Sequence, residues 1–146
     1  MSDRVQQHNI GALLSVVTSV EPQSSIAATL NGGGIDRQAH NMPGSCVLHQ
    51  AAGAISGGPA TSSVISKLQD SADNAAFADY KPDGVNVATT VALTAANTEN
   101  GVNVELTSAR RYIRAVTTLF FTGGAAPAAL VVSDIVLGGE KLLPAV

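Results

Sequence analysis

Few residues of this chain have the types and spacing that catalysis or metal binding requires. Cys46 and His49 are three positions apart. Side chains alternate between the two faces of a strand, so this pair would point to opposite sides and could not hold one metal ion together. A small buried thiol and a His at the solvent edge is the simpler interpretation. His8 and His40 fall in expected loops.

Two further segments carry weak chemical signals. Residues 70–74 (DSADN) group oxygen ligands that calcium accepts, but they lack the acidic spacing and closing Glu of a calcium loop, and Asp and Asn are ordinary turn residues. Residues 32–34 (GGG) lack the Lys-Ser/Thr pair of a phosphate loop. The sequence contains no Gly-x-Ser-x-Gly nucleophile motif. We therefore expect no catalytic, cofactor or metal site, and a protein that is not an enzyme.

Arg110, Arg111 and Arg114 form a cluster of cations. If they lie on a strand, Arg110 and Arg114 share one face with Tyr112, and Arg111 lies on the other. One interpretation is a solvated face in which Arg stems cover apolar neighbours and pair with Glu105 across a hairpin. The other is a docking patch for an acidic surface on a partner subunit, because Arg and Tyr are enriched at interfaces.

The composition predicts a core without large rings. The chain has 146 residues, of which 45% are apolar but only 3% aromatic, and Trp is absent. The core must be built from Val, Ile, Leu and Ala, which bury less area per side chain than Phe or Trp. Charged residues make up 13% of the chain, against roughly 25% in an average soluble domain. We expect so weakly charged a surface to be covered, and contacts within a homo-oligomer to supply part of the stability.

The net charge and the cysteine content limit which classes of partner and which cellular compartment we expect. A net charge of −3 argues against a nucleic-acid partner, which requires a basic stripe that contacts several phosphates. The single Cys46 cannot form an internal disulfide, which fits synthesis in a reducing cytoplasm. The sequence shows neither an export signal nor an apolar run near 18 residues, so we expect no membrane partner.

Short strands are the elements that must position these residues. Residues 102–106 and 110–121 alternate apolar and polar residues with period two, which is typical of strands with one buried face. Further strands are expected at residues 25–30, at 45–55 with a Gly-marked bend, at 63–70 and around Val131, and a β-branched run covers 85–93. Turn formers separate these runs. The pattern predicts an all-β fold, an antiparallel β-sandwich of the jelly-roll type.

The N-terminal segment differs from the rest. Residues 10–20 are apolar without clean periodicity, and turn formers follow at residues 21–25. This segment could be a helix, a strand or an extended arm. We favour an N-terminal arm at residues 1–24 that packs on a neighbouring subunit, followed by the sandwich domain at residues 25–146. The predicted interaction residues are Ile10, Leu13, Leu14 and Val17 of the arm, together with Arg110, Tyr112 and Arg114.

The order of several short motifs resembles that of small structural proteins of tailed-bacteriophage virions, over roughly residues 35–144. The motifs are residues 35–38 (IDRQ), 47–53, 67–73 (KLQDSAD), 77–79 (FAD), 109–114 (ARRYIR), 136–139 (VLGG) and the terminal Leu143-Pro144. The resemblance implies a β-sandwich that decorates or cements a capsid. Such proteins usually form oligomers that sit where major capsid subunits meet.

The resulting hypothesis is a bacteriophage capsid decoration (cement) protein that is made in the host cytoplasm. It would form a homo-oligomer, expected to be a trimer, on the virion surface and bind the major capsid protein. Binding that exists only on the mature lattice stabilises that lattice by mass action. Two alternatives stay open: a head-tail connector or tail structural protein, and a carbohydrate-binding module. The second is weakened by a poverty of aromatic residues, since Tyr80 and Tyr112 are the only tyrosines.

Overall fold

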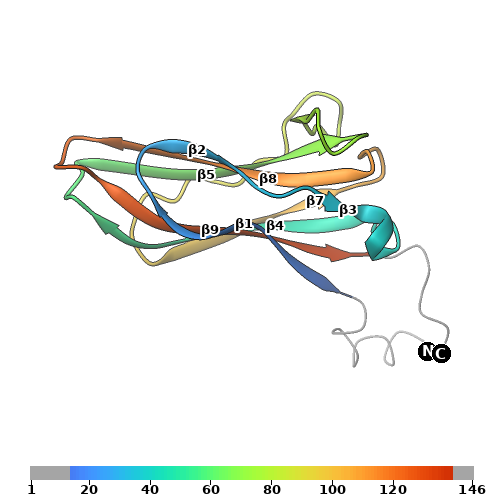
Figure 1. Cartoon of the computed structure of the whole chain (residues 1–146), viewed down its shortest axis with the longest axis horizontal. Coiled ribbons are helices and arrows are strands. Elements are labelled where there is room, and N and C mark those ends of the chain that lie inside the picture. Colours follow the sequence, from blue (N-terminus) through green and yellow to red (C-terminus); the bar gives the residue numbers. More distant parts are fainter. Residues whose placement is uncertain (1–13, 140–146) are drawn as a thin grey trace.

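The described chain, residues 14–139 of a computed structural model, forms two antiparallel sheets that pack face to face (Figure 1). The first sheet has the order β1 (Ser15–Ser25), β9 (Ala128–Gly138), β4 (Ser45–Ser56), β7 (Thr98–Glu105). The second has the order β2 (Ala28–Asn31), β8 (Tyr112–Thr122), β5 (Thr61–Ser71), β6 (Ala78–Asp79), and β3 (Ile35–Asp36) also pairs with β8. A short 3-10 turn, η1 (Arg37–His40), follows β3. The predicted all-β antiparallel sandwich is confirmed.

Period-two alternation decides which face each strand buries. In β4, Cys46 and Leu48 are buried, whereas His49 and Ala51 lie at outward positions. Strands β5 and β9 alternate in the same way. Each strand thus sends one row of side chains into the interior and one to the outside. The inward rows of the two sheets meet and form the core.

A polar layer divides this core into two apolar clusters. The larger cluster contains Leu48 and Ile135, and the smaller contains Ala52 and Val131. On β9, Ser133 lies between the members of the two clusters, and Ser66 of β5, Thr117 of β8 and Gln50 of β4 hold the same position on their strands. These four side chains are fully buried.

Three of these polar residues form a closed set of hydrogen bonds, which we call the hydroxyl triangle. The Oγ of Ser66 lies 2.8 Å from Oγ1 of Thr117 and 2.9 Å from Oγ of Ser133, and the last two oxygens are 2.7 Å apart. Each hydroxyl can donate once and accept once, so the triangle satisfies itself. It ties the first sheet, through Ser133, to the second.

At one end of the sandwich, the buried Arg37 joins three loop positions. Its Nη1 donates to the carbonyls of Ala109 and Arg110, and its Nη2 donates to those of Pro43 and Leu106, both at 2.9 Å. Within residues 14–139 no carboxylate forms an ion pair with Arg37, so carbonyl dipoles take the place of a counter-ion. Burial lowers the pKa of this guanidinium.

The side of the sandwich between β5 and β7 is closed by residues 80–94. The hydroxyl of Tyr80 donates to the Glu105 carbonyl at 2.7 Å, and the Asn100 amide donates to the Val91 carbonyl at 2.7 Å. The β-branched run at residues 85–93 forms no full strand. It meets β5 through two isolated bridges, Val64 with Leu93 and Lys67 with Thr89.

The predicted N-terminal arm is wrong from Ser15 onward. Ser15–Ser25 form β1, an edge strand that runs antiparallel to β9 of the same chain. Val17 and Val20 pack on the chain's own core, which supplies the burial that we assigned to a neighbour. The pairing with β9 shifts register between Thr18 and Val20 and again between Val20 and Gln23. These irregularities break the period-two pattern by which strands are recognised.

No helix of the described residues is long and apolar enough to cross a membrane.

Candidate docking surface

The outward side of the first sheet is rich in apolar side chains. Val16 of β1, Val136 of β9 and Val47 of β4 are neighbours across adjacent strands and form one row. Val16 is 69% exposed, and Leu130 of β9 is 47% exposed. We call the outward positions of β1, β9, β4 and β7 the docking face, namely Val16, Thr18, Val47, His49, Ala51, Gly53, Glu99, Gly101, Asn103, Glu105, Leu130, Val132, Asp134 and Val136.

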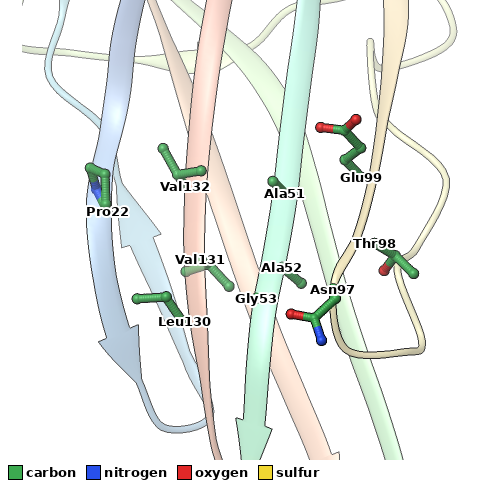
Figure 2. Close-up of a pocket in the computed structure, with 10 residues that line it drawn as sticks. All are labelled: Pro22, Ala51, Ala52, Gly53, Asn97, Thr98, Glu99, Leu130, Val131 and Val132. Atoms are coloured by element: carbon green, nitrogen blue, oxygen red, sulfur yellow. The ribbon is translucent and has the colours of Figure 1, made fainter.

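A shallow hollow of about 380 Å³ lies on the docking face (Figure 2). Residues from all four strands of the sheet line it, including Pro22, Gly53 and Leu130. A Cβ placed on Gly53 would lie 3.2 Å from Cδ2 of Leu130, so the missing side chain lets Leu130 rest close to β4. No aromatic residue lines the hollow, which leaves a sugar without a ring to stack on.

The ionisable groups of the docking face are three carboxylates and one histidine. His49 Nε2 lies 3.2 Å from Oε2 of Glu99, and its Nδ1 lies 3.8 Å from Oδ2 of Asp134. The third carboxylate, Glu105, accepts from Thr107. The two carboxylates near His49 lie at opposite edges of its ring, so the three groups do not converge on one point. Residues 14–139 contain no cluster of three or more groups that could hold a metal ion.

Lys and Arg are absent from the docking face. Within the described part of the chain, they lie in the interior, as Arg37, or on the second sheet and its loops, as Lys67, Lys81, Arg110, Arg111 and Arg114. The two sides of the sandwich therefore differ in character. One is apolar with unbalanced acidic groups, and the other mixes both signs.

The predicted Arg cluster splits into separate intrachain contacts. Arg110 precedes β8, and its Nη2 donates to Oδ1 of Asp70 at 2.7 Å while its backbone N–H donates to Oδ2 at 2.9 Å. Arg111 forms an ion pair with Asp36, also at 2.7 Å. The predicted pairing with Glu105 is wrong, because the loop before β8 turns toward β5 and β3 instead.

Tyr112 and Arg114 share the outward face of β8, as expected for alternate residues of a strand. Arg114 donates twice to the side-chain oxygen Oε1 of Gln69, at 3.0 and 2.8 Å, and its guanidinium lies 4.2 Å from the ring centre of Phe77. Arg110 does not join them, because it precedes β8 and binds Asp70, which lies at a buried position of β5, whereas the Arg114 partner Gln69 lies at an outward position. These contacts support the interpretation as a solvated face, while a docking role for Arg110, Tyr112 and Arg114 stays a prediction.

The other predicted residues have varied positions. Leu14 is 42% exposed and covers Gly138, where a Cβ would lie 3.0 Å from its Cδ2. Val17 is half-buried against the core. Ile10 and Leu13 lie outside the described residues.

Cys46 and His49 lie on opposite faces of β4, as the spacing predicts. Burial raises the pKa of the Cys46 thiol to about 12. In the segment 70–74, the Asp73 carboxylate accepts from the backbone N–H groups of Ala75 and Ala76, so it stabilises a turn. Asp70 is engaged by an arginine and does not face Asp73 as a second ligand.

We did not predict the docking face from the sequence, although the sequence contains a signal for it. Residues 130–132 (LVV) and 135–137 (IVL) of β9 are apolar at both inward and outward positions, as are residues 46–48 (CVL) of β4. Continuous apolar runs are typical of strands that are covered on both faces. Their outward members lie partly exposed among residues 14–139, which makes this side of the sheet a candidate docking surface.

Comparison with known proteins gives no family. No protein-family model matches this chain, and no curated protein matches it. Among solved structures, it is similar to the SPBc2 prophage-derived protein YomS, with a TM-score of 0.41 and 9% identity over 84% of this chain and 92% of that one. A structure described as Bacillus endospore appendages that form disulfide-linked pili gives a TM-score of 0.37 and 12% identity, over 88% and 90%.

A mutant VP2 protein of infectious bursal disease virus, in derived particles, gives a TM-score of 0.36 and 14% identity. The match covers 90% of this chain but 32% of the virus protein, so this chain spans about a third of its length. Similarities of this strength carry no argument about function.

Proposed function

We propose that this chain is a non-enzymatic structural protein of a bacteriophage virion, which decorates the capsid and cements it. It binds the assembled lattice of major capsid protein through the docking face. The motif order in the sequence supports the viral assignment, and the docking face supports the mode of binding. The reduced, buried Cys46 agrees with synthesis in a host cytoplasm before assembly.

The observation that carries this proposal is an apolar outer side on a sheet whose inner side is already a complete core. A sheet with one solvated face normally alternates apolar and polar residues. Here Val16, Val47, Val132, Val136 and Leu130 occupy positions where that pattern would place polar residues. Their exposure costs free energy that a bound partner recovers, at roughly 25 cal/mol per Å² of apolar surface.

The charges of the docking face define the partner's chemistry. Glu99, Glu105 and Asp134 lie among the apolar residues and no Lys or Arg balances them. A complementary surface is apolar and carries Lys or Arg at its rim, which fixes orientation and excludes acidic surfaces. A lattice that presents such a surface only after maturation is stabilised by mass action, because the protein binds the mature state alone.

Cosedimentation tests the proposal directly. Purified protein is mixed with emptied mature capsids of the phage that encodes it, and separately with immature capsids. We expect it to pellet with mature capsids and to raise the temperature at which they disassemble. Failure to bind either form would contradict the proposal. Electron microscopy of labelled virions separates the alternative of a head-tail or tail component, because a ring at the neck or along the tail would replace label over the head.

A matched pair of variants tests the docking face. Leu130→Asn removes a half-exposed apolar side chain from the face, whereas Val85→Asn removes one that is 72% exposed in the loop after β6. We expect Leu130→Asn to weaken capsid binding about tenfold or more, since a buried Leu contributes roughly 1.5–3 kcal/mol. Val85→Asn should bind like the native protein. Equal binding by all three proteins would show that the lattice contacts a different surface.

A further inference from the structure

Most strand edges of this sandwich are short or covered. Strand β6 has two residues, and β2 has four and ends at three consecutive glycines. Residues 80–94 lie along β5 and also bond to β7. Sheet proteins commonly protect their edges in these ways, because an unpaired row of N–H and C=O groups invites another strand.

Among the described residues 14–139, the first part of β1 has no such protection. Its residues 15–18 pair with β9 on one side only. Ser19, by contrast, is engaged with the second sheet, since its carbonyl accepts from Gly33 and its hydroxyl donates to the Gly33 carbonyl. Farther along β1, Glu21 and Pro22 supply a charge and a missing N–H, which are typical edge-protecting devices. The open edge thus covers residues 14–18.

The open edge is suited to a second copy of itself. Residues 14–18 (LSVVT) carry no charge, so two copies meet without repulsion, and β-branched residues favour strand pairing. The docking face, in contrast, carries three carboxylates and no Lys or Arg, so two such faces would repel each other. The backbone groups of the open edge and the side chains of the docking face therefore take different partners, although Val16 and Thr18 belong to both.

We propose that two copies of this chain pair along the open edge of β1, with residues 14–18 of one copy antiparallel to residues 14–18 of the other. Directly opposite residues of an antiparallel strand pair lie on the same face of the sheet. Only registers that place outward residues opposite outward residues, and inward opposite inward, are therefore allowed. The register that pairs all five residues places Val16 opposite Val16 of the second copy, on a two-fold axis. The 69% exposed Val16 side chain then gains an apolar neighbour.

This pairing joins the two first sheets into one eight-stranded sheet and places the two docking faces side by side. A strand pair of five residues buries less than the roughly 1,200 Å² of a standard stable interface, so the free dimer dissociates on dilution. On a lattice, two linked faces bind more tightly than one. A two-fold contact between like surfaces closes at two copies, so the trimer expected from the resemblance would need a second interface.

Solution mass and a single cysteine test the pairing. By light scattering after gel filtration, the mass of the native chain should rise from 14.7 kDa toward twice that value as concentration increases. Val16→Cys should form a disulfide-linked dimer on mild oxidation, because opposed residues of an antiparallel pair lie within disulfide range. Val91→Cys, at a site that is 79% exposed but outside β1, is the matched control and should form no disulfide-linked dimer. The native Cys46 is buried in both proteins.

A charge at the two-fold axis provides an independent variant. Val16→Lys places two ammonium groups together, so its mass should stay at 14.7 kDa where the native chain is dimeric, and Val91→Lys should dimerise normally. Thermal melting checks that each variant is folded. A native chain that is monomeric at every concentration, a mass three times that of one chain, or no cross-link at Val16→Cys would overturn the pairing. Capsid binding by the monomer would in that case still be measurable, so this failure is distinct from failure of the proposed function.

Discussion

Replacing Arg37 should destabilise this protein more than replacing any exposed arginine of the chain. The side chain is 2% exposed, and its two terminal nitrogens donate four hydrogen bonds to backbone carbonyls of the loops around Pro43 and Leu106 and of Ala109 and Arg110. The substitution Arg37→Met keeps a long apolar stem and removes every donor. It leaves four carbonyls in a region with little access to water.

The expected loss follows from the balance of these contacts. A hydrogen bond to a charged group contributes roughly 1.5–3 kcal/mol, so four would exceed the whole stability of many domains. Loop relaxation and relief of the buried charge offset part of this sum. A buried acceptor that loses its donor costs about 1–3 kcal/mol, and with partial relaxation of the four carbonyls we expect a total of about 3–5 kcal/mol for Arg37→Met. At roughly 3 °C per kcal/mol for a chain of this size, Tm falls by about 10–15 °C.

Urea unfolding followed by far-ultraviolet circular dichroism measures the effect, since the chain lacks Trp. Arg111→Met is the matched control. Arg111 has a 44% exposed side chain and forms an ion pair with Asp36, so solvent screens its contribution and only a small fraction of the Arg37 shift is expected. If Arg37→Met unfolds at the same urea concentration as the native chain, the guanidinium does not hold the loops and the reasoning is refuted.

Three further predictions concern the interior and the turns. Ser133→Ala should lower the free energy of unfolding, measured in urea, by about 1–2 kcal/mol, because it opens the hydroxyl triangle. The triple variant Ser66→Ala, Thr117→Val, Ser133→Ala should cost no more than that single change. A larger cost for the triple variant would contradict the view that the three hydroxyls satisfy one another. Hydrogen bonds from Asn86 lower the pKa of Asp83 to about 2, below the roughly 3.9 of an unfolded Asp. The stability that the Asp83 carboxylate contributes is therefore present above about pH 4 and lost as the pH falls toward 2. In Asp83→Ala, the urea midpoint should change less with pH between about 4 and 2 than in the native chain, and an equal change in both proteins would count against this assignment. The Cys46 thiol, with a pKa of about 12, should react with a thiol reagent at pH 8 only after unfolding, and rapid labelling of the folded chain would disprove its burial.

The strands that could be predicted from the sequence are those whose signals are local. The run at residues 45–55 corresponds to Ser45–Ser56, residues 63–70 to Thr61–Ser71, and residues 110–121 to Tyr112–Thr122. Alternation and turn residues mark these strands without reference to the rest of the chain. Strand β1 was missed because bulges interrupt its alternation, and a bulge becomes visible only against its partner β9.

The candidate site depends on contacts that no local pattern specifies. One interpretation of the arginine cluster was pairing with Glu105 across a hairpin, but Arg110 meets Asp70, 40 residues away, because the loop before β8 turns toward β5. The buried Arg37 and the hydroxyl triangle were likewise unexpected. Each of these polar groups forms hydrogen bonds with partners from distant segments of the chain. Its burial is tolerated only because those hydrogen bonds are formed.

The amino-acid sequence alone determined that this chain is an antiparallel sheet protein with an aliphatic core, since period-two alternation and turn chemistry act over a few residues. It also determined that Cys46 and His49 point to opposite faces. Only the tertiary structure decided that β1, β9, β4 and β7 lie side by side, so that outward Val, Leu and Ala of β1, β9 and β4 and the outward carboxylates of β7 and β9 form one acidic docking face. Strand order and register are set by long-range pairing, and a surface exists only once those pairings are made.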